Sequence, residues 1–281
     1  MKETIQKIRE ELHIDQEQFA SLLGISPSTI KHWESGVEKP DIGMQSQLYE
    51  LCRMSQIDLT DYLIGREYTI GNGQILYHAS RKGIEGMIRP ISRARCDFGK
   101  GFYMGTDPLQ PLTLVCNEDN PVFYTVDLDM SGLRILDIEV GLEWAMLIAY
   151  YRGYMEGHEH TELYKKYAHM ADNYDLICGF IANDRMYQVL TDFFEMRIMD
   201  TALIASLSAL QLGRQYVAIS QRACDQIKII KTRKLDKLDL MFLIAKSEMR
   251  RKEGKALADR MVMLHRRDGL FFDEILNGAK K

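Results

Sequence analysis

Apolar residues recur every three to four positions through the first 64 residues, and this spacing is the period of an amphipathic helix. Ile5, Ile8 and Leu12 form the first such stripe. The alternation of apolar and polar residues that indicates a strand is almost absent from this segment. The pattern therefore predicts an all-helical N-terminal module of five short helices.

Capping residues set the limits of the second and third helices in this module. Asp15 precedes the second helix and Ser26 precedes the third, where their side chains can accept a hydrogen bond from a free amide group. Pro27 suits the first position of the third helix. Gly24 and Gly36 follow the two helices, at the place where glycine ends a helix in the left-handed conformation. We expect two helices separated by a tight turn.

The helical period ends in a glycine-rich segment around residues 65–73, which predicts a linker or a tight turn. Strand and helix patterns then follow with irregular spacers, and this is typical of an α+β domain. The expected strands are 75–79, 101–104, 121–127, 135–136, 176–182, 215–220 and 227–231. The expected helices between them are 141–156, 162–171, 186–197 and 201–212. The last part, 235–276, predicts two or three amphipathic helices broken at Gly254 and Gly269.

These patterns divide the chain into four parts. We expect a helical domain over residues 1–65, a linker over 66–73, an α+β domain over 74–231, and a basic helical extension over 232–281 that packs on the second domain.

Composition fits a chain with a sizeable core, because 46% of the 281 residues are apolar and 27% are charged. The longest apolar runs are far shorter than the roughly 18 to 20 residues that cross a bilayer, and no leader opens the chain. We therefore expect a cytoplasmic protein with no membrane partner. Its five cysteines are odd in number and widely spaced, which predicts reduced thiols rather than disulfides or a CxxC pair.

The net charge of −4 conceals a gradient along the chain. Residues 1–64 carry a net charge of −5, residues 65–230 also carry −5, and residues 231–281 carry +6. The basic C-terminal end suits a nucleic acid or an acidic partner, but a solvated helix face gives the same count. Charge alone does not decide between these interpretations.

Residues 15–36 read DQEQFASLLGISPSTIKHWESG and resemble the helix-turn-helix of phage-repressor-like regulators of the xenobiotic-response-element type. The residues that match the packing positions of that family are Phe19, Ala20, Leu23, Ile25, Ile30 and Trp33. The resemblance implies that the third helix enters the major groove of DNA and that the start of the second helix touches phosphate. By this resemblance the DNA-binding residues are Gln16 on a phosphate and Ser26, Ser28, Thr29, Lys31 and His32 at base edges.

The charge of this module opposes strong DNA binding, because Lys and Arg supply most of the affinity for the phosphate backbone. The module carries six positive and eleven negative side chains. Three interpretations stay open: weak DNA binding, DNA binding as a homodimer, or a protein-docking or structural role.

Two short stretches of the second domain are unusually polar for strands. Residues 77–80 read Tyr-His-Ala-Ser, and residues 99–103 read Gly-Lys-Gly-Phe-Tyr. A third stretch, 215–230, begins with Gln215 and contains two apolar segments. A lone histidine in a strand is more often a core or edge residue than a ligand contact. Together and in this order, however, the stretches resemble the ADP-ribosyltransferase fold of the diphtheria-toxin and poly(ADP-ribose) polymerase type, and 175–185 resembles a bacterial branch of unknown function.

This resemblance implies an ADP-ribosyltransferase-like α+β domain that takes NAD as a substrate. The implied catalytic residues are His78 on the adenosine ribose, Tyr103 stacked on nicotinamide and Gln215 on the 2′-hydroxyl of the nicotinamide ribose. The backbone at Ala79 would hold the carboxamide. The full set of implied NAD contacts is Tyr77, His78, Ala79, Ser80, Gly101, Phe102, Tyr103 and Asp184.

Gln215 stands where the family has a glutamate. An amide can both donate and accept a hydrogen bond, but it lacks the negative charge that favours an oxocarbenium-like cation. The outcomes left open are mono-transfer, slow hydrolysis, or NAD binding without chemistry. Candidate carboxylates for the missing charge are Asp184, Glu195 and Glu143, while Arg185 and Lys100 are candidates for the pyrophosphate.

No metal is expected, because His158 and His160 lie in a polar segment without a helix or strand to orient them, and His169 adds no known motif. The sequence thus favours a mono-ADP-ribosyltransferase with a DNA-binding or docking module, acting on an unknown protein or nucleic-acid acceptor. The alternative is a non-catalytic transcriptional regulator that senses NAD or ADP-ribose. A toxin or defence component with an antitoxin-like partner is compatible with the first hypothesis.

Overall fold

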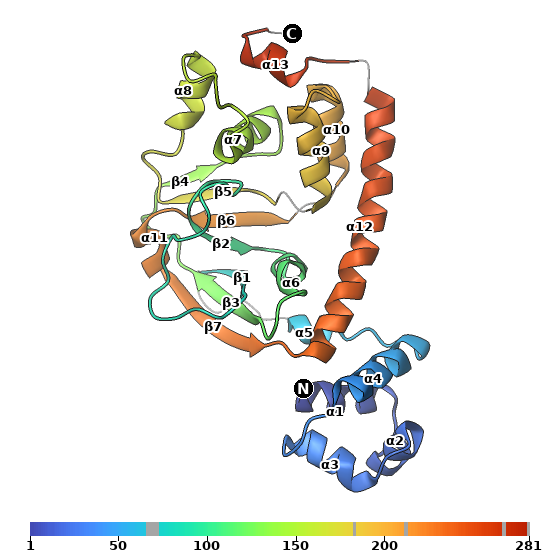
Figure 1. The fold of residues 1–281 in the computed structure, drawn as a ribbon. Coiled ribbons are helices and arrows are strands. Elements are labelled where there is room, and N and C mark those ends of the chain that lie inside the picture. Colours follow the sequence, from blue (N-terminus) through green and yellow to red (C-terminus); the bar gives the residue numbers. More distant parts are fainter. Residues whose placement is uncertain (66–72, 182–183, 211–212, 266–267, 280–281) are drawn as a thin grey trace.

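The computed structural model describes residues 1–65, 73–181, 184–210, 213–265 and 268–279 (Figure 1). An N-terminal group of helices lies at one end of the molecule, and an α+β domain with a mixed sheet forms the rest. The N-terminal helices are α1 (Lys2–Glu11), α2 (Gln16–Leu23), α3 (Pro27–Ser35), α4 (Ile42–Met54) and α5 (Thr60–Ile64).

The capping predictions for α2 and α3 are confirmed. The Asp15 carboxylate accepts a hydrogen bond from the Gln18 amide at 2.8 Å, and the Gln18 side chain accepts one from the Asp15 amide at 3.0 Å. Ser26 caps α3 through its hydroxyl. Gly24 and Gly36 have φ values of +70° and +83°, which a side chain would disfavour.

The α+β domain contains seven strands within the described residues, and all of them belong to one sheet. The strands are β1 (Gln74–Ser80), β2 (Phe102–Gly105), β3 (Val122–Leu128), β4 (Ile135–Asp137), β5 (Leu176–Phe180), β6 (Arg214–Ala218) and β7 (Ile227–Lys234). Their order is β4-β5-β6-β2-β1-β3-β7, with β4 and β5 parallel and the other neighbours antiparallel. Each strand overlaps one that the sequence pattern predicts.

The helices of this domain are α6 (Leu109–Val115), α7 (Leu142–Arg152), α8 (Glu162–Ala168), α9 (Asp184–Phe194), α10 (Asp200–Ala209), α11 (Gln221–Asp225), α12 (Lys237–His265) and α13 (Phe272–Leu276). The pattern did not predict α6 or α11. Helix α6 contains Pro111, but this proline lies in the first turn, where its missing amide hydrogen costs little. Leu109, Leu112 and Val115 of α6 are buried.

The expected break at Gly254 is wrong, because α12 continues through it for 29 residues. At about 1.5 Å per residue this helix is roughly 44 Å long. Gly254 and Ala258 are both buried and lie four positions apart, so they occupy one face of the helix. A small residue lets a packed neighbour approach closely, and one glycine costs a long helix only about 1 kcal/mol. The chain does turn at Gly269, between α12 and α13.

Helix α12 joins the two parts of the molecule (Figure 1). One continuous hydrophobic cluster contains Ile5, Ile8, Phe19, Ile30 and Leu48 of the N-terminal helices together with Leu238, Phe242 and Leu243 of α12. A buried hydrogen bond of 2.8 Å from Thr4 to Asp239 and a 3.0 Å ion pair between Lys246 and Asp58 lie at the same junction. The N-terminal module is therefore docked on the second domain through a shared core. Of the expected linker, residues 66–72 lie outside the described part of the chain.

Candidate functional site

A cavity of about 830 Å³ lies over the sheet. Strands β1, β2 and β6, the end of α7, and helices α6, α9 and α12 contribute side chains to its wall. This volume falls in the range of roughly 300–1,000 Å³ that is typical of small-molecule sites.

The three predicted catalytic residues line this same cavity, although they are far apart in sequence. His78 comes from β1, Tyr103 from β2 and Gln215 from β6. The sheet brings the three together because Gly105 of β2 is the register partner of both Tyr77 and Gln215. Adjacent strands lie only about 5 Å apart, so residues near this row are close neighbours.

His78 is fixed in one orientation by its neighbours. Its Nδ1 atom lies 2.7 Å from the backbone oxygen of Tyr103, and its ring stacks on Phe102 with the centroids 4.3 Å apart. A carbonyl oxygen only accepts, so Nδ1 carries the proton and Nε2 is left as an acceptor. Burial lowers the pKa of His78 below its ordinary value, because the imidazolium is disfavoured away from water. The site thus holds a neutral imidazole.

Tyr103 uses its hydroxyl inside the protein. The hydroxyl donates to the backbone oxygen of Gly99 at 2.8 Å and accepts from the backbone amide of Phe98 at 3.0 Å. Burial raises the pKa of Tyr103, so the phenol stays neutral. The hydroxyl closes the turn before β2, and the ring remains the part of this residue that is suited to contact a ligand.

Gln215 belongs to a polar cluster that the sequence did not predict. Its Nε2 atom donates to the Phe180 backbone oxygen at 2.9 Å and to Oδ2 of Asp97 at 3.1 Å. Arg152, at the end of α7, donates from Nε to Oδ1 of Asp97 at 3.1 Å. The Arg152 guanidinium lies 4.7 Å above the ring centroid of Tyr187.

Asp97 and Arg152 both line the cavity, and their side chains are 14% and 12% exposed. Nη1 of Arg152 is buried and has no hydrogen-bond partner among the residues that the structure describes. A buried donor without a partner is costly, and a ligand oxygen would satisfy it. Arg93, Arg95 and Arg250 also line the cavity, where the four arginines outnumber the two carboxylates, Asp97 and Asp107, so a net positive charge faces a ligand although Arg95 pairs with Glu156 and Arg250 with Asp107.

Two of the candidate carboxylates named from sequence, Glu143 and Glu195, lie outside the cavity wall. Glu143 pairs with Lys166 on the surface, and Glu195 pairs with Arg197. Asp184 begins α9, but its side chain, like that of Arg185, lies outside the described part. Among the described residues, Asp97 is the carboxylate that contacts Gln215.

The other implied NAD contacts divide into two groups. Tyr77 and Ala79 line the cavity. The Ser80 hydroxyl instead donates to the Gly83 backbone oxygen at 2.9 Å, and Phe102 is buried against His78. At Gly101 an added Cβ would lie 2.4 Å from Val217, so this glycine permits close packing of β2 on β6. In this structure Ser80, Gly101 and Phe102 do not line the cavity. They contact the strands, the turn and the histidine ring next to it.

Helix α3, which the sequence predicts to enter the major groove, lies on the outer side of the N-terminal module (Figure 1). Ser26, Ser28, Lys31 and His32 are exposed, and Thr29 is half-buried. The Ser26 hydroxyl lies 2.7 Å from that of Ser28 and 2.8 Å from that of Thr29. Five of the six residues predicted to contact DNA therefore lie together at this helix.

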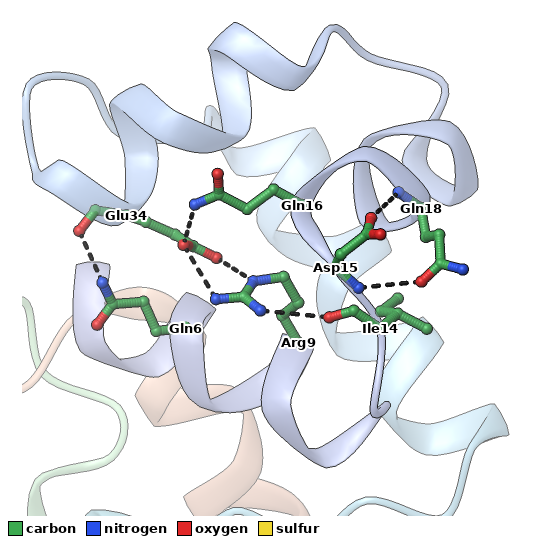
Figure 2. Close-up of polar contacts among 7 residues, drawn as sticks. All are labelled: Gln6, Arg9, Ile14, Asp15, Gln16, Gln18 and Glu34. Carbon is green, nitrogen blue, oxygen red and sulfur yellow. Dashed lines mark hydrogen bonds and ion pairs between the residues drawn. The ribbon is translucent and has the colours of Figure 1, made fainter.

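The sixth residue, Gln16, takes part in a polar network around Glu34 (Figure 2). Glu34 is buried and accepts hydrogen bonds from Arg9 Nε at 2.7 Å, Arg9 Nη2 at 3.3 Å and Gln16 Nε2 at 2.6 Å. Gln6 also donates to the Glu34 backbone oxygen at 3.1 Å. The network fastens α1, α2 and α3 to one another, so Gln16 has a structural partner in this state.

The described residues form no metal site and no membrane span. In the described ranges no group of three or more His, Cys, Asp or Glu side chains is arranged to hold a metal ion. His169 pairs with Asp172 at 2.8 Å on the surface. Within the same ranges, no helix combines the length and the apolar character needed to cross a bilayer.

The fold and the two sites define a helix-turn-helix protein with an α+β domain that carries a ligand-sized cavity. Residues 5–44 match the helix-turn-helix family, which indicates DNA binding. Residues 74–229, more than half of the chain, match the family described as "Protein of unknown function (DUF3990)", and the chain belongs to this family. Comparison with curated proteins finds no match, and neither does comparison with solved structures.

Proposed function

We propose that this protein is an NAD-dependent mono-ADP-ribosyltransferase whose helix-turn-helix binds DNA. The observation that carries the proposal is that His78, Tyr103 and Gln215, placed in order by the resemblance of the sequence, line one cavity. Because β1, β2 and β6 are neighbours in the sheet, the three residues can contact one ligand together.

Each residue has chemistry that suits NAD. Neutral His78 offers Nε2 as an acceptor for a hydroxyl of the adenosine ribose. The Tyr103 ring, held by its buried hydroxyl, offers a flat face for nicotinamide. Nη1 of Arg152, which has no hydrogen-bond partner among the described residues, suits the pyrophosphate, as do the other arginines that line the cavity, Arg93, Arg95 and Arg250. The volume of about 830 Å³ is sufficient for a dinucleotide that is partly exposed.

The test is incubation with NAD labelled in the ADP-ribose part, in the presence of cell extract or mixed nucleic acids. We expect label transfer to an acceptor, or nicotinamide release, that is lost in His78→Ala and in Tyr103→Ala. The control is His169→Ala, an exposed histidine paired with Asp172 outside the cavity, which should behave as wild type. Wild-type NAD binding in both cavity variants, or no NAD binding by any form, would rule out the assigned site.

The DNA-binding module has its own test. Genomic fragments should be retarded in a gel at low salt, and Lys31→Gln should weaken this binding and relax its sequence preference. Lys165→Gln, on α8 and paired with Glu162, is the matched control. If no fragment is retained, the module has a docking role instead. Band stoichiometry reports whether a homodimer binds.

A second candidate is a regulator that senses NAD or ADP-ribose without turning it over. The observation that favours it is that one helix serves both sites, because Ser247 and Arg250 of α12 line the cavity while Phe242 and Leu243 pack among the N-terminal helices. In this case NAD or ADP-ribose should change DNA affinity while no nicotinamide is released. A toxin or defence role with an antitoxin-like partner would be added to the first candidate if expression of the wild type, but not of His78→Ala, arrests growth.

A further inference from the structure

We propose that Asp97 is the carboxylate of this site and acts as a positioning residue through Gln215, an inference that rests on the proposed function. In the family that the sequence resembles, one glutamate provides both the ribose contact and the negative charge. Here two side chains divide these roles: Gln215 contacts the ribose, and Asp97 beside it supplies the negative charge.

The hydrogen bonds of the Gln215 amide fix its orientation. A side-chain amide nitrogen has two hydrogens, and both are used here, toward the Phe180 backbone oxygen at 2.9 Å and toward Asp97 Oδ2 at 3.1 Å. The nitrogen is thereby held in place, and Oε1 is the atom left for a ligand hydroxyl. Asp97 thus selects which end of the amide is available to the ligand.

The same surroundings disfavour a glutamate at position 215. A carboxylate at residue 215 would place an oxygen where the amide nitrogen now lies, facing both the Phe180 carbonyl and the Asp97 carboxylate at about hydrogen-bond distance. Oxygen atoms without a proton between them repel one another. With Asp97 present, an amide is the group that fits, so Gln215 and Asp97 form a matched pair.

Asp97 is held in place by its neighbours on both sides. The next residue, Phe98, is buried, and its ring fills the space beside Gly179, where an added Cβ would lie 2.6 Å from it. The Phe98 amide donates to the Tyr103 hydroxyl. Arg152 binds Oδ1 of Asp97 and leaves Oδ2 to Gln215. A group that acts on a transition state must be fixed in advance in this way.

In the reaction, the bond between C1′ of the nicotinamide ribose and the nicotinamide nitrogen breaks. The bonding electron pair leaves with nicotinamide, which becomes neutral, and positive charge develops on C1′ and the ring oxygen. The acceptor oxygen or nitrogen, or water, then forms a bond to C1′ and releases its proton to solvent. Gln215 Oε1 binds the 2′-hydroxyl, and the Asp97 charge favours the cation next to it.

The experiment measures nicotinamide release in four forms of the full chain: wild type, Asp97→Asn, Gln215→Glu, and the double variant Asp97→Asn/Gln215→Glu. We expect Asp97→Asn to lower kcat about 100-fold, the scale of one lost electrostatic group, with the KM for NAD changed less than about threefold. The double variant returns one carboxylate and one amide to the pair in reversed positions and should recover at least about tenfold of that loss.

Gln215→Glu alone separates this role from a structural one. Two facing carboxylates share a proton at lower pH, so kcat should fall at neutral pH and recover as the pH is lowered. This variant also tests the inference if Asp97→Asn fails to fold. A rise in kcat at neutral pH would show that the charge was missing at residue 215, and it would overturn the inference.

The matched control is Asp175→Asn, because Asp175 is also a buried carboxylate bound to an arginine, Arg134, and to the Ser220 hydroxyl. It should lose stability without losing kcat. If no form of the protein, wild type included, releases nicotinamide or transfers label, the proposed function fails. If the wild type is active and folded Asp97→Asn keeps kcat within about threefold, the function stands and the role of Asp97 is refuted.

Discussion

Removal of the Glu34 side chain should destabilise the DNA-binding module more than removal of any exposed acid. Glu34 is 5% exposed, and its partner Arg9 is 22% exposed. In Glu34→Ala, Arg9 loses two hydrogen bonds and Gln16 loses one. Among the described residues, the half-buried Arg9 guanidinium then keeps only its 3.2 Å bond to the Ile14 backbone oxygen.

The cost follows from the burial of the pair. Breaking a buried ion pair by removing one partner costs about 3–5 kcal/mol, and the partial access of Arg9 to water places this case near 3 kcal/mol. Glu34→Gln keeps an acceptor of the same size and loses the charge, so about 1–2 kcal/mol is expected.

The assay is urea denaturation at pH 7 followed by far-UV circular dichroism, where a lower midpoint with an unchanged slope reports lost stability. The matched control is Glu38→Ala, since Glu38 is 58% exposed and lies 3.6 Å from His32. It should cost less than about 0.5 kcal/mol. If Glu34→Ala loses less than about 1 kcal/mol, or no more than the control, then the network does not hold the three helices together.

Three further predictions concern the sheet, the junction and the site. Gly101→Ala should cost about 1–3 kcal/mol, since the new methyl group would lie 2.4 Å from Val217, whereas Gly141→Ala, with open space around it, should be near neutral in the same denaturation assay. Leu243→Ala should cost about 2–5 kcal/mol and increase proteolysis between the two parts of the molecule, whereas Leu257→Ala on the exposed face of the same helix should not. Burial lowers the pKa of His78 in the folded state below its ordinary value of 6.5. Below about pH 6.5 the unfolded chain therefore binds a proton that the folded chain does not, and the free energy of unfolding falls. Between pH 7.5 and 5.5 the wild type should therefore lose more unfolding free energy than His78→Gln, and equal losses would contradict a buried neutral imidazole.

Local signals predicted much of the fold because they act over a few residues. The hydrogen bond of Asp15 to Gln18 closes within three positions, and the αL glycines act at a single residue. The strand patterns also gave limits within a few residues, because alternation reports a half-buried strand directly. The predicted break at Gly254 was wrong because a single glycine disfavours a helix only weakly. Packing along α12 outweighed that local preference.

The candidate site was predictable only in part. His78 and Tyr103 lie in short motifs, and a resemblance can locate such motifs. Asp97 and Gln215 meet across 118 positions, and Asp97 and Arg152 across 55, so no periodicity or spacing connects them. Similarly, the engagement of Gln16 by Glu34 depends on how α2 and α3 pack, which the sequence does not express.

Helix α12 runs without a break from the N-terminal module past the wall of the cavity. Phe242 at the junction and Arg250 at the cavity lie eight positions apart on this helix, which is about 12 Å along its axis. If α3 binds DNA, the cavity would lie at a constant distance from the bound sequence, since one continuous helix connects the N-terminal module to the cavity wall. An acceptor of ADP-ribose would then have to lie at that distance from the bound DNA site, in addition to having suitable chemistry.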